Sequence, residues 1–215
     1  MSARNGRIEC TRLLLERGAD IEAKNDKGVR PIHAAALMNH AACVRLLVEC
    51  GADTEARALG KKASDVAQNE TTRATLRPAN VKHLRETSFI KSAKEGLAWR
   101  MRLLLNAGVP ADTAEGDSTA LHFCALVGHL ECVRLLIGKN ATVGARKRNG
   151  VQPLHLCAAS GRTECARLLM NAGADIDAQS DSGKAALHHC AARGHVNLMK
   201  LLLDRGANKA FKTND

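Results

Sequence analysis

Histidine and cysteine recur together in this chain in a pattern that suits metal binding or catalysis. The tripeptide H-x-C occurs at residues 122–124, 155–157 and 188–190, and neighbouring copies lie 33 residues apart. Imidazole nitrogens and thiolate sulfurs are preferred ligands of zinc, and a histidine can act as the general base for a nucleophile. The spacing therefore raises a zinc site and a catalytic site as two hypotheses.

The elements that must position these residues are copies of one repeated unit. Similar strings end each unit: LLLERGAD, LLVECGAD, LLMNAGAD and LLLDRGAN, with Gly18 and Gly51 33 residues apart, as are Gly173 and Gly206. Upstream lie RPIH, TALH, QPLH and AALH, each followed by a turn residue such as Gly128. Apolar residues at helical spacing predict two short helices per unit. Such a pair cannot bury its apolar face alone, so the units must stack as a solenoid.

The repeat resembles the ankyrin repeat, whose period is 33 residues and whose T-P-L-H-x-A pattern is matched by TALHFCA and QPLHLCA. The resemblance covers nearly the whole chain. It implies an all-α fold, an ankyrin-repeat solenoid of stacked helix-turn-helix pairs with projecting β-turn loops.

Departures from the period predict two stacks. Residues 1–77 are expected to form the first, with a truncated first repeat, a full second repeat and a shortened, capping-like third repeat. A junction is expected at residues 78–87, followed by a second stack of four repeats over 88–215. A single bent stack is the alternative. Since the first repeat begins inside its first helix, the chain is expected to be a fragment or to be covered there by something else.

The stacking argues against both chemical hypotheses. Equivalent residues in adjacent repeats should lie about 10 Å apart, which is too far to share a zinc ion whose bonds to sulfur measure about 2.3 Å. The cysteines are therefore expected to be small core residues, and the resemblance implies that each repeat histidine ties the turn to the first helix. We expect no catalytic, metal-binding or cofactor-binding residue and no cofactor; the chain is predicted not to be an enzyme.

Two pairs of apolar residues are candidates for contact with a partner. The resemblance implies a concave groove lined by the turn tips and by the last residues of each first helix. Those positions carry Leu37 and Met38, Leu126 and Val127, and, in the last repeat, Arg193. Exposed apolar residues with polar surroundings suggest a contact site. The alternative is that neighbouring repeats partly cover them.

The stretch GARKRNG supplies a basic candidate. It places Arg146, Lys147 and Arg148 at a turn tip, whereas sister turns carry Asp26 and Asp181 at the position of Arg148. A short acid there is expected to bond the turn backbone, and clustered cations repel one another. An acidic partner would offset both costs. The alternative is drift in a tolerant loop.

Positive charge is concentrated around the predicted junction. The chain has a net charge of +10, and residues 57–102 hold eleven cations and four acids, which gives +7 for that segment. These cations are Arg57, Lys61, Lys62, Arg73, Arg77, Lys82, Arg85, Lys91, Lys94, Arg100 and Arg102. They form either a solvated connector or a basic patch for an acidic peptide, a nucleic-acid backbone or a lipid headgroup.

The leading hypothesis is a non-enzymatic protein-interaction module, a scaffold or adaptor, that binds an acidic protein segment. Nucleic-acid or anionic-surface binding is the second hypothesis, disfavoured because only 2% of the residues are aromatic and few can stack on bases. A third is that the stack is the targeting region of a larger enzyme, such as a kinase or a ubiquitin-ligase adaptor. With no signal peptide and no apolar run long enough to span a membrane, an intracellular location is expected, cytoplasmic or nuclear. The oligomeric state is left open.

Overall fold

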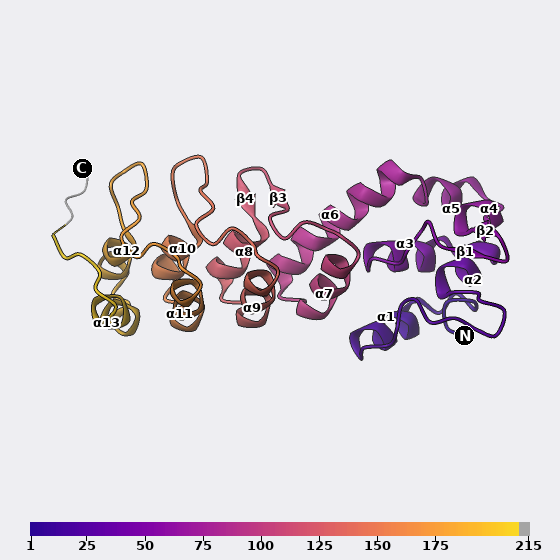
Figure 1. Ribbon diagram of the computed structural model, residues 1–215, viewed down its shortest axis with the longest axis horizontal. Coiled ribbons are helices and arrows are strands. Elements are labelled where there is room, and N and C mark those ends of the chain that lie inside the picture. Colours follow the sequence, from indigo (N-terminus) through magenta and orange to yellow (C-terminus); the bar gives the residue numbers. More distant parts are fainter. Residues whose placement is uncertain (211–215) are drawn as a thin grey trace. The chain divides into compact units, whose positions relative to one another are not determined.

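The computed structural model describes residues 1–210, which fall into two compact units. Unit 1 comprises Met1–Phe89 and Trp99–Val109; unit 2 comprises Ile90–Ala98 and the described residues from Pro110 onward. Nearly all regular structure is helical (Figure 1). This confirms the predicted all-α class.

Unit 1 holds short helices and one small hairpin. Its elements are α1 (Ile8–Glu16), α2 (Pro31–Leu37), α3 (Ala41–Glu49), β1 (Arg57–Ala58), β2 (Lys61–Lys62), α4 (Ala63–Val66), α5 (Glu70–Thr75), most of α6 (Pro78–Glu95) and nearly all of α7 (Ala98–Asn106). Helix α2 packs against α3 and α4, and α3 packs against α1 and α5. Helix pairs therefore follow one another as the period predicts.

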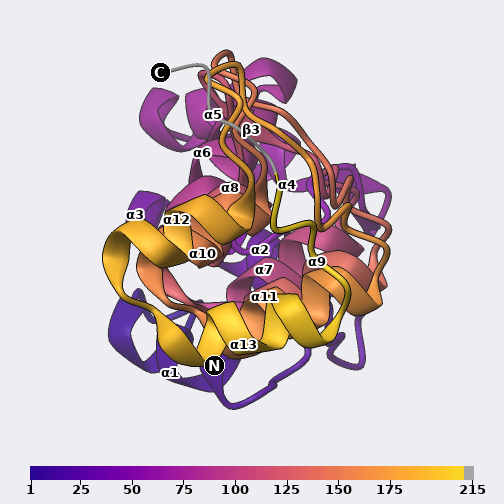
Figure 2. The ribbon, with the colours of Figure 1, turned by 90° about the vertical axis from the view of Figure 1, so that its left-hand side faces the viewer.

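Unit 2 repeats one helix pair three times after the end of α6. Its elements are β3 (Ala114–Glu115), β4 (Ser118–Thr119), α8 (Ala120–Val127), α9 (Leu130–Gly138), α10 (Pro153–Ser160), α11 (Thr163–Asn171), α12 (Ala186–Arg193) and α13 (Val196–Asp204). Helices α8, α10 and α12 pack side by side in one layer, and α9, α11 and α13 pack in a second (Figure 2). The loops that precede the first-layer helices project from one edge of this stack as a row of fingers (Figure 1).

Left-handed residues separate the two helices of most pairs; between α4 and α5 the backbone is extended instead. Gly161 ends α10 at φ 66°, and an added Cβ would lie 2.7 Å from Nδ1 of His195 in the next repeat. Glycine is therefore required there for both conformation and space. Asn39 takes the equivalent place after α2 at φ 53°, and its Oδ1 accepts hydrogen bonds from the backbone N–H groups of Gln68 and Asn69 at 2.9 and 3.0 Å.

The cysteines belong to the core, with one exception. The Sγ of Cys157 is fully buried and donates to the carbonyl of Ala125 in the preceding repeat at 3.6 Å. Seven of the eight cysteines are buried free thiols, which confirms the predicted packing role for them. Cys10 was expected to share that role, but it is exposed on α1.

The predicted junction is part of a helix. Residues 78–87 and the start of the predicted fourth repeat form the single 18-residue helix α6, so no separate connector stands between them. Two arginines join this region to the end of α3 within unit 1. Arg85 donates to the carbonyl of Ala52 at 2.7 Å, and buried Arg100 lies 3.2 Å from a carboxylate oxygen of Glu49. The boundaries of the two predicted stacks stay a prediction.

Candidate functional site

Two of the repeat histidines, His122 and His155, are hydrogen-bonded at both ring nitrogens, whereas His33 is bonded at Nε2 and its buried Nδ1 has no partner. Nδ1 of His155 accepts from the backbone N–H of Gln152 at 2.9 Å, and Nε2–H donates to the carbonyl of Ala178, in the next finger, at 2.8 Å. Burial lowers the pKa of His155, as it does the pKa of His122. Because both of its ring nitrogens are bonded, the neutral imidazole of His155 connects one repeat to the next. This confirms the tie to the first helix that the resemblance implied.

The thiols likewise serve packing. Burial raises the pKa of the Cys157 thiol and raises that of Cys190 to about 11, so both are held in the unreactive protonated form. Within residues 1–210, no group of three or more histidines, cysteines or acids is placed to hold a metal ion.

Carboxylates link successive fingers. In three repeats an acid at the same position accepts a hydrogen bond from a backbone N–H of the following repeat. In unit 1, the carboxylate of Glu22 accepts from the backbone N–H of Asp53 at 2.7 Å. In unit 2, Asp112 bonds Thr142 at 2.8 Å and Asp177 bonds Asn208 at 2.9 Å. The fingers are thereby held in register.

The finger 144–150 replaces this link with an arginine. Gly144 stands at the position of the linking acid, so it offers no carboxylate. Instead, the guanidinium of Arg146 reaches the next finger, where Nη1 donates to the carbonyl of Gln179 at 3.2 Å and Nη2 lies 3.3 Å from Oδ1 of Asp181. Arg146 was predicted as a partner contact; the structure gives it a linking role within the stack.

The other two cations of this finger keep free side chains. The backbone N–H of Arg148 donates to Oδ2 of Asp117 on the preceding finger at 3.1 Å. That bond is the main reason why the pKa of Asp117 is lowered, with smaller contributions from Ser118 and Lys147. Among the described residues, neither Lys147 nor Arg148 forms a side-chain ion pair, and Arg148 is exposed. The finger thus presents an exposed Arg148 and a half-buried Lys147 whose charge acts on Asp117, on a backbone bonded to both neighbouring fingers.

The expected role of the sister acids was wrong for Asp26. In that turn the bonding side chain is Asn25, whose Oδ1 accepts from the N–H groups of Lys27 at 3.1 Å and Val29 at 2.9 Å. Asp181 faces Arg146 of the preceding finger. In the turn of Asp26, the position equivalent to Arg148 is therefore not the one whose side chain bonds the turn backbone.

The apolar pairs at the ends of α2 and α8 are about half exposed, so their surroundings cover them in part but not completely. In unit 2, Leu126 is 43% and Val127 41% exposed; in unit 1, Leu37 is 50% and Met38 42% exposed. Arg193 is also exposed, at the end of α12. Because α8, α10 and α12 are neighbours, unit 2 places its two apolar residues and Arg193 on ends of one layer of helices (Figure 2).

Most cations of the basic segment have an ion-pair or hydrogen-bond partner within this chain. Their partners include acids from outside the segment: Lys62 pairs with Glu55, Lys94 with Glu115 and Arg100 with Glu49. Lys94 also lies 4.8 Å from the centre of the Phe123 ring, a cation–π distance. Further cations pair within the segment or bond carbonyls: Arg57, Arg73, Arg77, Lys82, Arg85 and Lys91. Acids from outside the segment therefore offset three of its seven net positive charges.

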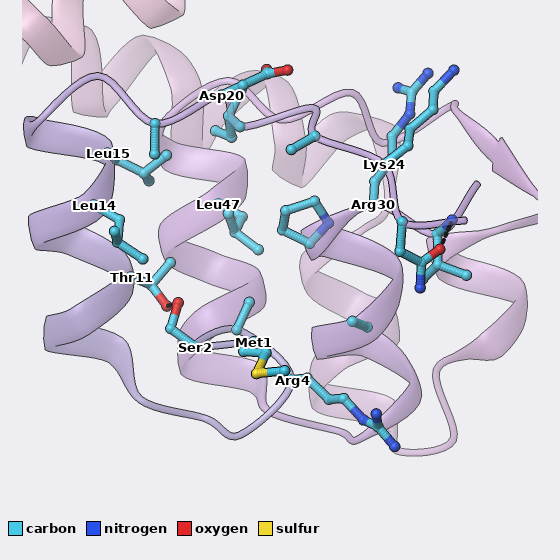
Figure 3. A pocket seen from close by; sticks show the side chains of 18 residues that line it. Met1, Ser2, Arg4, Thr11, Leu14, Leu15, Asp20, Lys24, Arg30 and Leu47 are labelled. Carbon is cyan, nitrogen blue, oxygen red and sulfur yellow. Dashed lines mark hydrogen bonds between the residues drawn. The ribbon is translucent and has the colours of Figure 1, made fainter. Parts of the chain in front are cut away.

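Two features of unit 1 were not found from the sequence. The first is a cavity of about 450 Å³ between α1 and α2, into which Leu14, Leu15 and Leu47 point (Figure 3). Ser2 and Thr11 share a hydrogen bond of 3.0 Å on its wall, while Arg30 and Lys24 extend away from it. The predicted truncation of the first repeat was the available signal for it.

The second is the tip of the β1–β2 hairpin. Leu59 and Gly60 have φ values of 52° and 77°, as a type I′ turn requires, and Leu59 is 76% exposed. The left-handed region costs an ordinary L-residue about 1–2 kcal/mol, so asparagine or glycine is the expected residue. A leucine before a glycine between two short strands was the signal.

Comparison with known proteins supports a single family. A family model described as ankyrin repeats in three copies matches residues 1–58, 63–147 and 140–213. No curated protein matches the chain significantly. None of the helices within residues 1–210 is both long and apolar enough to cross a membrane. The match spans most of the chain and agrees with the stacked helix pairs, their left-handed glycines and the histidine ties, and we conclude that this chain belongs to the ankyrin repeat family.

Proposed function

We propose that the chain is a non-enzymatic scaffold or adaptor that binds an acidic segment of a partner protein. Ankyrin repeats are generally protein–protein interaction modules. The observation that carries the acidic preference is the finger 144–150, where Lys147 and Arg148 have no ion pair among the described residues. The finger backbone is bonded on both sides, since the N–H of Arg148 donates to Asp117 and the carbonyl of Asn149 accepts from the N–H of Asp181, so little conformational entropy is lost there when a partner binds.

The remaining contacts are assigned by exposure. Leu126 and Val127 in unit 2, and Leu37 and Met38 in unit 1, offer apolar surface that is 41–50% exposed. Arg193 adds a cation at the end of α12. A few such anchors carry most of the affinity, while the cations raise the association rate and select an acidic partner. Arg146 acts in this proposal by holding the finger rather than by touching the partner.

Nucleic-acid or lipid-surface binding is a weaker alternative, because most cations of the basic segment have internal partners. A targeting role within a larger enzyme, such as a kinase or ubiquitin-ligase adaptor, is compatible with the same surface. An intracellular location, cytoplasmic or nuclear, goes with either role.

A pull-down at physiological salt with nuclease tests the proposal. The double variant Lys147→Ala/Arg148→Ala is compared with the wild-type chain and with the control Lys24→Ala/Lys27→Ala, which removes two cations from another finger. An acidic protein held by wild type and control, and lost by the first variant, supports the proposal. Equal capture by all three chains contradicts the role of the finger. Loss of all bound material on nuclease treatment would favour nucleic-acid binding.

A further inference from the structure

The tip of the β1–β2 hairpin carries a residue that the hairpin itself disfavours. Leu59 adopts φ 52° and exposes 76% of its surface. Asparagine or glycine fits this turn position without strain, and a bulky residue with positive φ is an outlier. Leucine at the tip is therefore less favourable for the turn than asparagine or glycine, and its side chain is exposed to water.

The fold makes little use of this side chain. The hairpin is held by other groups: Ala58 is buried, Arg57 donates to the carbonyl of Gly60 at 2.7 Å, and Lys62 pairs with Glu55. The cluster of buried residues in unit 1 does not include Leu59. Tips of sister fingers carry polar residues or glycine instead: Asp26, Gly116, Arg148 and Asp181.

The charges beside the hairpin tip indicate which kind of partner surface would bind it. Arg57 and Lys61 flank the turn, are both exposed, and have no carboxylate partner among the described residues. An apolar side chain between two cations matches an apolar recess edged by carboxylates.

We propose that Leu59 is an anchor that this chain inserts into an apolar recess, edged by carboxylates, on a protein partner. The inference rests on the proposed function and adds to it a second contact, in unit 1, independent of the finger 144–150. Burying a leucine fully on binding corresponds to an affinity gain of about ten- to a hundredfold.

The contact is tested first by photo-crosslinking in cells. A photoreactive amino acid is placed at position 59 and, as the control, at position 27 on the neighbouring finger tip. A protein crosslinked from position 59 and not from position 27 is purified, and its Kd for the full chain is measured by calorimetry. Absence of any crosslink specific to position 59 overturns the inference.

The decisive variant separates binding from folding. Leu59→Asn relieves the turn, so its Tm should equal or exceed that of wild type, while the Kd should rise about tenfold or more. Val196→Asn, at an apolar position in unit 2 that is 56% exposed, should leave the Kd unchanged. An unchanged Kd for Leu59→Asn overturns the inference. If Lys147→Ala/Arg148→Ala weakens the same complex while Leu59→Asn does not, the proposed function stands without this anchor; if neither variant weakens it, both fail.

Discussion

The substitution Gly161→Ala should destabilise the protein more than the same change one repeat later, at Gly194. Both glycines have left-handed φ values, 66° and 69°. Alanine at either site should cost about 1–2 kcal/mol for the backbone conformation. At Gly194 the added methyl group enters open space, whereas at Gly161 it would lie 2.7 Å from Nδ1 of His195.

Displacing this imidazole adds a second cost. Nε2–H of His195 donates to the carbonyl of Ala159 at 3.3 Å, a bond worth about 0.5–1.5 kcal/mol. The total for Gly161→Ala is therefore about 2–3 kcal/mol, roughly 1 kcal/mol more than for Gly194→Ala. Urea unfolding followed by circular dichroism measures both values. The change at Gly194 is the matched control because it shares the conformational cost alone.

A third substitution tests the cause. In a His195→Ala background the methyl group at position 161 meets no ring, so the difference between the two glycine variants should vanish. Equal losses for the two glycine variants, or a difference that persists without the imidazole, would refute the packing argument.

Other expectations follow from burial. Burial lowers the pKa of His155 and His189 in the folded state; the unfolded chain then binds more protons, so stability present above about pH 6.5 should fall as the pH drops below that value. Urea midpoints from pH 8 to 5 check this, and a flat profile contradicts it. Cys10 should be the one thiol of eight that a thiol reagent labels in the native protein, as counted by mass spectrometry; a second rapidly labelled site would argue against the core assignment. Glu49→Gln leaves buried Arg100 without its counter-charge and should cost about 3 kcal/mol in urea unfolding, the lower end for a buried pair because Glu49 is partly exposed; a loss below about 0.5 kcal/mol would place the pair with exposed ones.

The helix pairs were predictable because their signals are local. The 33-residue period, the glycines between helices and the apolar spacing around Leu130 and Val133 each act within one repeat. The same holds for the histidine ties, since His155 accepts a hydrogen bond from the backbone N–H of Gln152, only three residues away.

The linking role of Arg146 was not predictable, because it depends on where the next finger lies. The sequence shows three adjacent cations, but only the stacked structure shows that Asp181 faces the first of them. The segment 57–102 posed the same problem, since Glu49 and Glu115 lie outside it along the chain and pair with its cations in space.

The carboxylate links between fingers also bear on how such an array grows. Each link joins a side chain of one repeat to a backbone N–H of the next, as from Glu22 to Asp53 and from Asp177 to Asn208. Since every non-proline residue carries that N–H, only one side chain has to be specified. A duplicated segment of one period brings its own acid and finds an acceptable donor at either insertion point. Gene duplication can therefore lengthen the array without a compensating mutation at the seam.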